Sequence, residues 1–156
     1  MELKSLYQDL ILDHGKNPRN FKSLDKPCDS IVAHNPLCGD KIEIFALLER
    51  DIIKDISFRG NGCAICLAAS SIMTELVIKK NINETKHLID FFLKKINKID
   101  TSKLPKISKE ESLKINSFSS VSNFPMRIKC ATLPWLGLNS LLFENKREIN
   151  IDIDKV

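Results

Sequence analysis

Three cysteines and an aspartate stand where their side chains could bind a metal ion or act as nucleophiles. Cys38 and Asp40 enclose a glycine in the run N-P-L-C-G-D, and Cys63 directly follows the run G-N-G. Cys130 lies in a later segment with helical spacing. Glycines beside Cys38 and Cys63 let the backbone come close to a bound ion. The four side chains would converge if the helices pack over the loop end of a sheet, whereas a single buried cysteine is more often a small core residue.

The position of Cys63 favours a thiolate, because it begins a predicted helix and the helix dipole stabilises negative charge at that end. Together with Cys66 it also forms a C-x-x-C motif. A redox C-x-x-C follows a strand in a βαβ unit, which is not predicted here, and a zinc knuckle needs a second such motif. We therefore expect Cys66 to be a core residue, and Cys28, which lies in a polar stretch, to be no ligand.

The three histidines are weaker candidates than the cysteines. His14 ends the first predicted helix, where a cation would suit the free carbonyl groups, and His87 is expected on a helix surface. His34 lies four residues before Cys38 and is the only histidine near the candidate site in the sequence. We expect none of them to be a ligand.

The elements that must position these residues follow from hydrophobic periodicity and from turn residues. The patterns predict an α+β fold, with a small antiparallel three-stranded sheet and helices packed on it. Ile52, Ile56 and Phe58 are expected on one face of the third strand. Asn83 is the expected N-cap of the third helix, and Pro134 is expected to kink or restart the last one. Helices are predicted over 2–14, 64–80, 84–98 and 125–143, strands over 30–34, 41–48 and 52–58, and a polar, broken segment over 100–123.

The composition is that of an ordinary globular protein. The chain has 156 residues, of which 43% are hydrophobic and 28% charged, and a formal net charge of +4. Its lysines are scattered along the chain, so we expect no nucleic-acid partner. No apolar run approaches the roughly 18 residues of a membrane span, and the first residues do not form a signal peptide. We therefore expect a cytoplasmic protein without a membrane partner, in which cysteines are ligands or nucleophiles more often than disulfides.

The motifs around the cysteines resemble the U-type iron–sulfur cluster assembly proteins, the family of IscU, SufU and the N-terminal domain of NifU. Within this family the chain is most similar to the SufU group. Lys129 stands before the third cysteine where IscU proteins have a histidine, and the polar stretch around 100–120 is similar to an insertion that the IscU group lacks. The resemblance implies a single domain over 1–156. It rests on the segments LYQDLILDHGKNPRN, NPLCGDKIEIF, GNGCAICLAASSIMTEL and FPMRIKCATLPWLGLNSLL.

The resemblance implies that Cys38, Asp40, Cys63 and Cys130 hold one metal ion, usually zinc in the SufU group. Three thiolates and a carboxylate suit the tetrahedral coordination of Zn²⁺, and the harder carboxylate is the natural ligand to release. The resemblance further implies that a PLP-dependent cysteine desulfurase of the SufS type donates persulfide sulfur to this protein. Cys38 is then the acceptor thiol, freed when a side chain of the desulfurase replaces it on the metal.

Family pattern also places Arg127 and Lys129 beside the site, where their positive charges could stabilise thiolate and persulfide. The sulfur would pass on to a scaffold of the SufBCD type or to apo iron–sulfur acceptors. The alternative is an IscU-like scaffold that binds Fe²⁺ or a [2Fe–2S] cluster with the same four residues. A purely structural zinc domain is disfavoured, because a carboxylate ligand in a loop makes such a site labile. In each case the resemblance implies a carrier or scaffold more than a free-standing enzyme.

Overall fold

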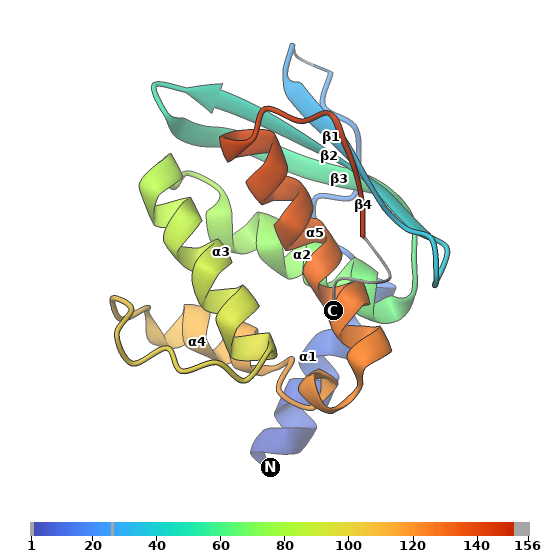
Figure 1. Ribbon diagram of the computed structural model, residues 1–156, viewed down its shortest axis with the longest axis vertical. Helices are drawn as coiled ribbons and strands as arrows, with labels where there is room; N and C mark the ends of the chain where they lie inside the picture. Colours follow the sequence, from blue (N-terminus) through green and yellow to red (C-terminus); the bar gives the residue numbers. More distant parts are fainter. Residues whose placement is uncertain (1, 26, 152–156) are drawn as a thin grey trace.

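The computed structural model describes residues 2–25 and 27–151. Their architecture confirms the expected α+β fold, in which helices pack on a mostly antiparallel sheet (Figure 1). None of the described helices is both long and apolar enough to cross a bilayer. In chain order the elements are α1 (Leu3–Lys16), β1 (Asp29–Asn35), β2 (Asp40–Glu49), β3 (Ile52–Asn61), α2 (Ala64–Val77), α3 (Ile82–Ile96), α4 (Lys109–Asn116), the 3-10 turn Val121–Asn123, α5 (Pro125–Phe143) and β4 (Glu148–Asn150).

The sheet has the strand order β3-β2-β1-β4. The three predicted strands pair antiparallel, as expected, and β4 adds a short parallel strand at the free edge of β1. β4 was not predicted, because a strand of three residues carries no recognisable alternation of buried and exposed positions. Ile149 lies opposite Ala33 in this pairing, so the chain returns to the sheet after crossing it as α5.

The outer end of β3 differs from the predicted pattern. Ile53 is fully buried and Ile52 is 42% exposed, although Ile52 was expected on the inner face. The register explains the difference, because Leu47 pairs with Asp55 but Leu48 pairs with Ile53, which leaves the residue between them unpaired. Such a β-bulge reverses the facing of every residue beyond it.

Helix α5 crosses the inner face of the sheet, with α2 beside it (Figure 1). The close approach depends on Gly137, where an added Cβ would lie 3.0 Å from the Cδ1 of Ile44 and 3.3 Å from the Cβ of Ala33. Helix α1 packs on α2 in turn. Its Gly15 faces Ala64, the first residue of α2, and an added Cβ there would lie 2.9 Å from the Ala64 carbonyl oxygen. The start of α2 is therefore fixed between α1 and the sheet.

An aromatic cluster connects the remaining helices to this layer. The rings of Phe92 in α3 and Trp135 in α5 stack with centroids 4.6 Å apart. The ring of Phe118 packs edge-on to Phe92 at 5.5 Å. All three side chains are at most 1% exposed, so the cluster ties α3, α5 and the chain after α4 into one core.

Three helix details correct the predictions. The N-cap of α3 is Asn81 instead of Asn83, because Asn81 and Glu84 form a capping box. The segment 100–123 was predicted to be broken but contains α4, which Ser108 and Glu111 cap in the same way. α5 runs through Pro134 as one helix, which excludes the restart, whereas the kink stays a prediction.

Candidate metal centre

The candidate site begins at the tight connection between β1 and β2. Asn35 and Asp40 are the last pair of the antiparallel ladder, and the Gly39 backbone N–H donates to the carbonyl of Asn35 at 3.0 Å. Gly39 has a φ of +72°, a conformation that favours glycine. This turn leaves Cys38 exposed at its tip and returns Asp40 to the interior, where it is 1% exposed.

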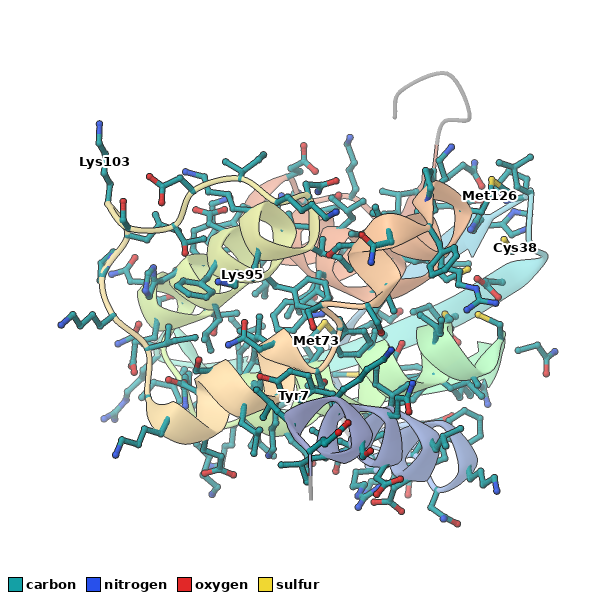
Figure 2. All side chains as sticks on the ribbon, turned by 90° about the horizontal axis from the view of Figure 1, so that it is seen from below. Tyr7, Cys38, Met73, Lys95, Lys103 and Met126 are labelled. Atoms are coloured by element: carbon teal, nitrogen blue, oxygen red, sulfur yellow. The ribbon has the colours of Figure 1, made fainter. Side chains whose placement is uncertain are left out.

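Three of the four predicted ligands lie together in the structure. Ligand atoms of Cys38, Asp40 and Cys130 are all within 4.8 Å of one another. The two sulfur atoms of Cys38 and Cys130 are 3.6 Å apart, although the residues are 92 positions apart in the chain. Figure 2 shows Cys38 at the same end of the molecule as Met126, whose carbonyl lies 3.6 Å from the Cys130 sulfur.

The side chain of Asp40, in the same group, has one carboxylate oxygen with a hydrogen-bond partner in the described part of the chain and one without. Its Oδ1 accepts a hydrogen bond from the backbone N–H of Cys63 at 2.9 Å. Its Oδ2 is buried and has no hydrogen-bond partner among the described residues. A buried carboxylate oxygen without a partner is costly, and a cation held by the adjacent thiols would satisfy it. The donor set of sulfur and carboxylate oxygen therefore fits a divalent ion such as zinc.

Cys63 stands beside this group at the start of α2. Its Sγ is the N-cap acceptor of the helix and receives the backbone N–H of Cys66 at 3.4 Å. The interaction with the Cys130 thiol, together with that N–H, lowers the pKa of Cys63 to about 6. Cys63 is exposed and is not a member of the group within 4.8 Å, but its N–H bond to Asp40 ties the two residues together.

Cys130 lies in the second turn of α5, which begins at Pro125. Its side chain is 3% exposed, in contrast to the exposed Cys38 and Cys63. The neighbouring Cys63 thiol and burial raise the pKa of Cys130. The two neighbouring thiols therefore differ, with the pKa of Cys63 lowered and that of Cys130 raised.

The other cysteines and histidines lie apart from the group of three. Cys66 is fully buried in the core, as expected, and burial raises the pKa of its thiol. His34 is half-buried in β1 opposite Lys41 and is not part of the group. His14, expected as a cation at a helix end, is instead buried with its Nδ1 2.7 Å from the Ser71 hydroxyl. Burial lowers its pKa, so the neutral form is favoured.

Cys28 is half-buried just before β1, and burial raises its pKa. His87 is half-buried on α3 and its Nε2 lies 2.8 Å from the carbonyl oxygen of Pro105. Neither residue belongs to the group of three candidate ligands.

Arg127 and Lys129 flank the first turns of α5 in different surroundings. The Arg127 guanidinium is exposed and lies 5.1 Å from the ring centroid of Phe124. It lines a groove of about 320 Å³ that also includes Ala64 and Ile65 from the start of α2. Lys129 is only 7% exposed and lines a different cavity, of about 240 Å³. The two cations therefore lie on different sides of the segment that carries Cys130.

One residue of the site was not singled out from the sequence. Asn35 was read only as part of a loop break before Pro36, but it is fully buried and directly opposite Asp40. The usable signal was the polar residue at a position that the alternation of Ile31 and Ala33 predicts to face inward.

Comparisons with known proteins agree over most of the chain. A model of the NifU-like N-terminal domain matches residues 6–131. The iron–sulfur cluster assembly scaffold protein IscU of Streptococcus pyogenes serotype M1 is 36% identical over 149 residues, which cover 96% of this chain and 88% of that protein. The zinc-dependent sulfurtransferase SufU of Bacillus subtilis (strain 168) is 38% identical over 141 residues, which cover 87% and 88%.

The fold is also similar to solved structures. One is a crystal structure from Fervidobacterium islandicum AW-1, described as a candidate iron–sulfur cluster assembly scaffold protein for the SUF system. It is 27% identical, with a TM-score of 0.75, and the match covers 86% of this chain and 95% of that one.

Proposed function

The chain belongs to the NifU-like N-terminal domain family of iron–sulfur cluster assembly proteins, and we propose that within this family it is a zinc-dependent acceptor of sulfur. The sulfur donor would be the persulfide of a PLP-dependent cysteine desulfurase. The acceptor would be Cys38, with Asp40, Cys63 and Cys130 as the other metal ligands. The similar SufU protein of Bacillus subtilis, a zinc-dependent sulfurtransferase, supports this assignment.

The observation that carries the proposal is the contrast in exposure within the group of ligands. Cys38 is exposed at the tip of a turn, whereas Asp40 and Cys130 beneath it are buried, and the exposed Cys63 is held as the N-cap of α2. An exposed thiol on a short loop can move toward a partner protein, while the backbones of the other three residues are anchored by a strand or a helix. The arrangement therefore supports Cys38 as the mobile nucleophile.

The transfer conserves electrons and needs no external oxidant. The Cys38 thiolate attacks the outer sulfur of the desulfurase persulfide, which forms a new S–S bond on Cys38. The S–S bond of the desulfurase breaks, and its electron pair leaves on the desulfurase cysteine as a thiolate. When bound, zinc keeps the cysteine thiols deprotonated at neutral pH.

We assign supporting roles to the two cations near Cys130. The exposed Arg127 is free to approach a partner persulfide from the groove beside α2. Lys129 is buried at the same turn of α5, where its charge raises the local positive potential. The product would be passed to a SufBCD-type scaffold or to apo iron–sulfur proteins.

The decisive experiment is intact-protein and peptide mass spectrometry after incubation with a cysteine desulfurase and cysteine. We expect one persulfide per chain, at Cys38, while zinc stays bound. Cys38→Ser should lose this persulfide and also the rate gain of the desulfurase. A persulfide found mainly on Cys130 would overturn the assignment of the acceptor.

A second candidate function is an IscU-like scaffold for a [2Fe–2S] cluster. Its specific support is the 36% identity to the IscU scaffold protein of Streptococcus pyogenes over nearly the whole chain. A scaffold needs all its ligands around iron at once, so the same protein should be loaded with iron and sulfide in parallel. A stable cluster that is transferred intact, together with a zinc form that accepts no sulfur, would establish the scaffold instead.

A further inference from the structure

Two buried polar atoms without partners belong to residues that pair with each other in the ladder at the candidate site. The Nδ2 of Asn35 and the Oδ2 of Asp40 have no hydrogen-bond partner among the described residues. The two residues are 0% and 1% exposed. Unpartnered buried polar atoms are rare in folded proteins and each calls for an explanation. Here one atom is a hydrogen-bond donor and the other is an acceptor.

The strand register places these two residues opposite each other. Asn35 and Asp40 form the last pair of the β1–β2 ladder, and opposite residues in such a pair direct their side chains to the same face. Four pairs earlier in the ladder, and so on the same face of the sheet, Ile31 lies opposite Ile44. Ile44 packs against Gly137 of α5. Both side chains therefore lie on the inner face of the sheet, beneath the helix layer.

The other polar atoms of the two side chains are already engaged. The Oδ1 of Asn35 accepts the backbone N–H of Leu37 at 3.3 Å. The Oδ1 of Asp40 accepts the backbone N–H of Cys63 at 2.9 Å. These two bonds tie both side chains to the backbone and leave the Nδ2 of Asn35 and the Oδ2 of Asp40 without a partner among the described residues.

We propose that Asn35 is a positioning residue for Asp40. Its Nδ2 donates a hydrogen bond to the Oδ2 of Asp40 when the carboxylate leaves the metal. This inference rests on the proposed function and on the expectation from the sequence that the carboxylate of Asp40 is the metal ligand that is released. A carboxylate released into a buried site without a donor is strongly disfavoured. The Nδ2 of Asn35 supplies that donor, so that Asp40 can move off the metal and leave a position open to a ligand of the partner protein.

The test measures ligand exchange on the protein loaded with Co²⁺, whose visible absorption reports its coordination. Imidazole serves as the incoming ligand, and the concentration at half-maximal spectral change is recorded. Asn35→Asp is the sharpest variant, because it keeps the shape and the Oδ1 acceptor but replaces the donor. We expect Asn35→Asp and Asn35→Ala to require about tenfold more imidazole than the wild type, the effect of losing one buried hydrogen bond to a charged group.

Two controls separate this role from a general effect on folding. Ser57→Ala removes a different buried polar group without a partner, the hydroxyl of a β3 residue that lies opposite Phe45. This variant should leave the imidazole response unchanged. In an Asp40→Ala background, adding Asn35→Asp should have no further effect, because the group on which it acts is absent. Cobalt content and thermal unfolding are recorded for each variant.

The results distinguish the inference from the function on which it rests. An Asn35→Asp protein with full cobalt content and the wild-type imidazole response would overturn the role of Asn35. The same holds if Asn35→Asp shifts the response equally with and without Asp40. If the Asn35 variants show the expected shift in imidazole response but the metal-loaded wild type accepts no persulfide, the proposed function alone is overturned.

Discussion

The cysteines of this chain differ in how far their surroundings allow them to bind a metal. Cys130 lies 3.6 Å from the Cys38 sulfur, whereas Cys66, only three residues after Cys63, is fully buried in the core. Cys28 lies before β1 and outside the group. Location relative to the β1–β2 turn therefore separates the proposed ligands Cys38 and Cys130 from Cys66 and Cys28 better than spacing in the sequence does.

The first prediction tests this separation by metal analysis of purified variants. Cys63→Ser and Cys130→Ser should reduce zinc from about one equivalent per chain to well below stoichiometric amounts, because each removes one of three thiolates. Cys66→Ser and Cys28→Ser should retain it. Loss of zinc in Cys66→Ser, with retention in Cys130→Ser, would show that the ligands are wrongly assigned.

The second prediction concerns the carboxylate. Asp40→Ala should still bind zinc, because three thiolates remain and water can occupy the fourth position. Sulfur transfer from the desulfurase should fall by about tenfold or more, as expected when a group that controls an exchange step is removed. The rate of persulfide formation on Cys38 measures the effect, and an unchanged rate would exclude a role for carboxylate release.

Packing between elements explains how the helices hold the site in place. α5 carries both Cys130 and Trp135, and the Phe92 ring of α3 stacks on Trp135. Phe118 closes the same cluster from the segment after α4. The position of Cys130 therefore depends on contacts more than one helical turn away from the site.

The third prediction is that Phe92→Ala lowers the free energy of unfolding by about 3–5 kcal/mol, the range for loss of a buried aromatic ring. Phe91→Ala is the matched control, because Phe91 is the next residue of α3 and only half-buried. Its loss should cost clearly less. Chemical denaturation of the zinc-loaded proteins measures both values, and equal losses would show that the aromatic cluster has no special weight.

Elements with a clear hydrophobic period in the sequence were predictable. Features that arise from the pairing of distant strands were not. The alternation of Ile42, Ile44 and Ala46 identified β2, and the N-P-L-C-G-D run identified the turn that carries Cys38 and Asp40. The bulge in β3 and the short β4 arise from pairing with distant strands, which a local pattern does not contain. The orphaned atoms of Asn35 and Asp40 are also visible only after the strands are paired.

At the scale of the whole molecule, a chain of buried and half-buried polar side chains connects α1, α2 and α4. The Nδ1 of His14 lies 2.7 Å from the Ser71 hydroxyl, which also accepts the backbone N–H of Arg19. The Nε2 of His14 is 3.5 Å from Glu75, which in turn lies 3.5 Å from Lys114. The Ser71 hydroxyl hydrogen is therefore available to the Nδ1, and the Nε2 proton faces the carboxylate.

The fourth prediction is a pH dependence that originates in His14. Burial and Arg19 lower its pKa below the ordinary value of 6.5, while Glu75 and Asp13 oppose the shift and Lys114 adds to it. The unfolded chain then binds more protons than the folded chain, so the stability from His14 is complete above pH 6.5 and is lost as the pH falls below it.

His14→Gln should therefore show a smaller loss of unfolding free energy between pH 7.5 and pH 5.5 than the wild type. The control is His87→Gln, because His87 is only half-buried and lies outside this polar chain. Both variants keep the metal site, so the pH dependence of that site cancels in the comparison. Denaturation at the two pH values provides the measurement. An identical pH dependence in the wild type and in His14→Gln would contradict the prediction.

Pro134 gives the helix above the site an uneven stiffness. A proline has no backbone N–H, so the carbonyl four residues earlier, that of Cys130, receives no helical hydrogen bond. The first turns of α5 are thus joined to the packed half around Trp135 and Gly137 by one link fewer. With one backbone hydrogen bond fewer at this point, the first turns of α5 resist bending relative to the packed half less than a helix without proline would.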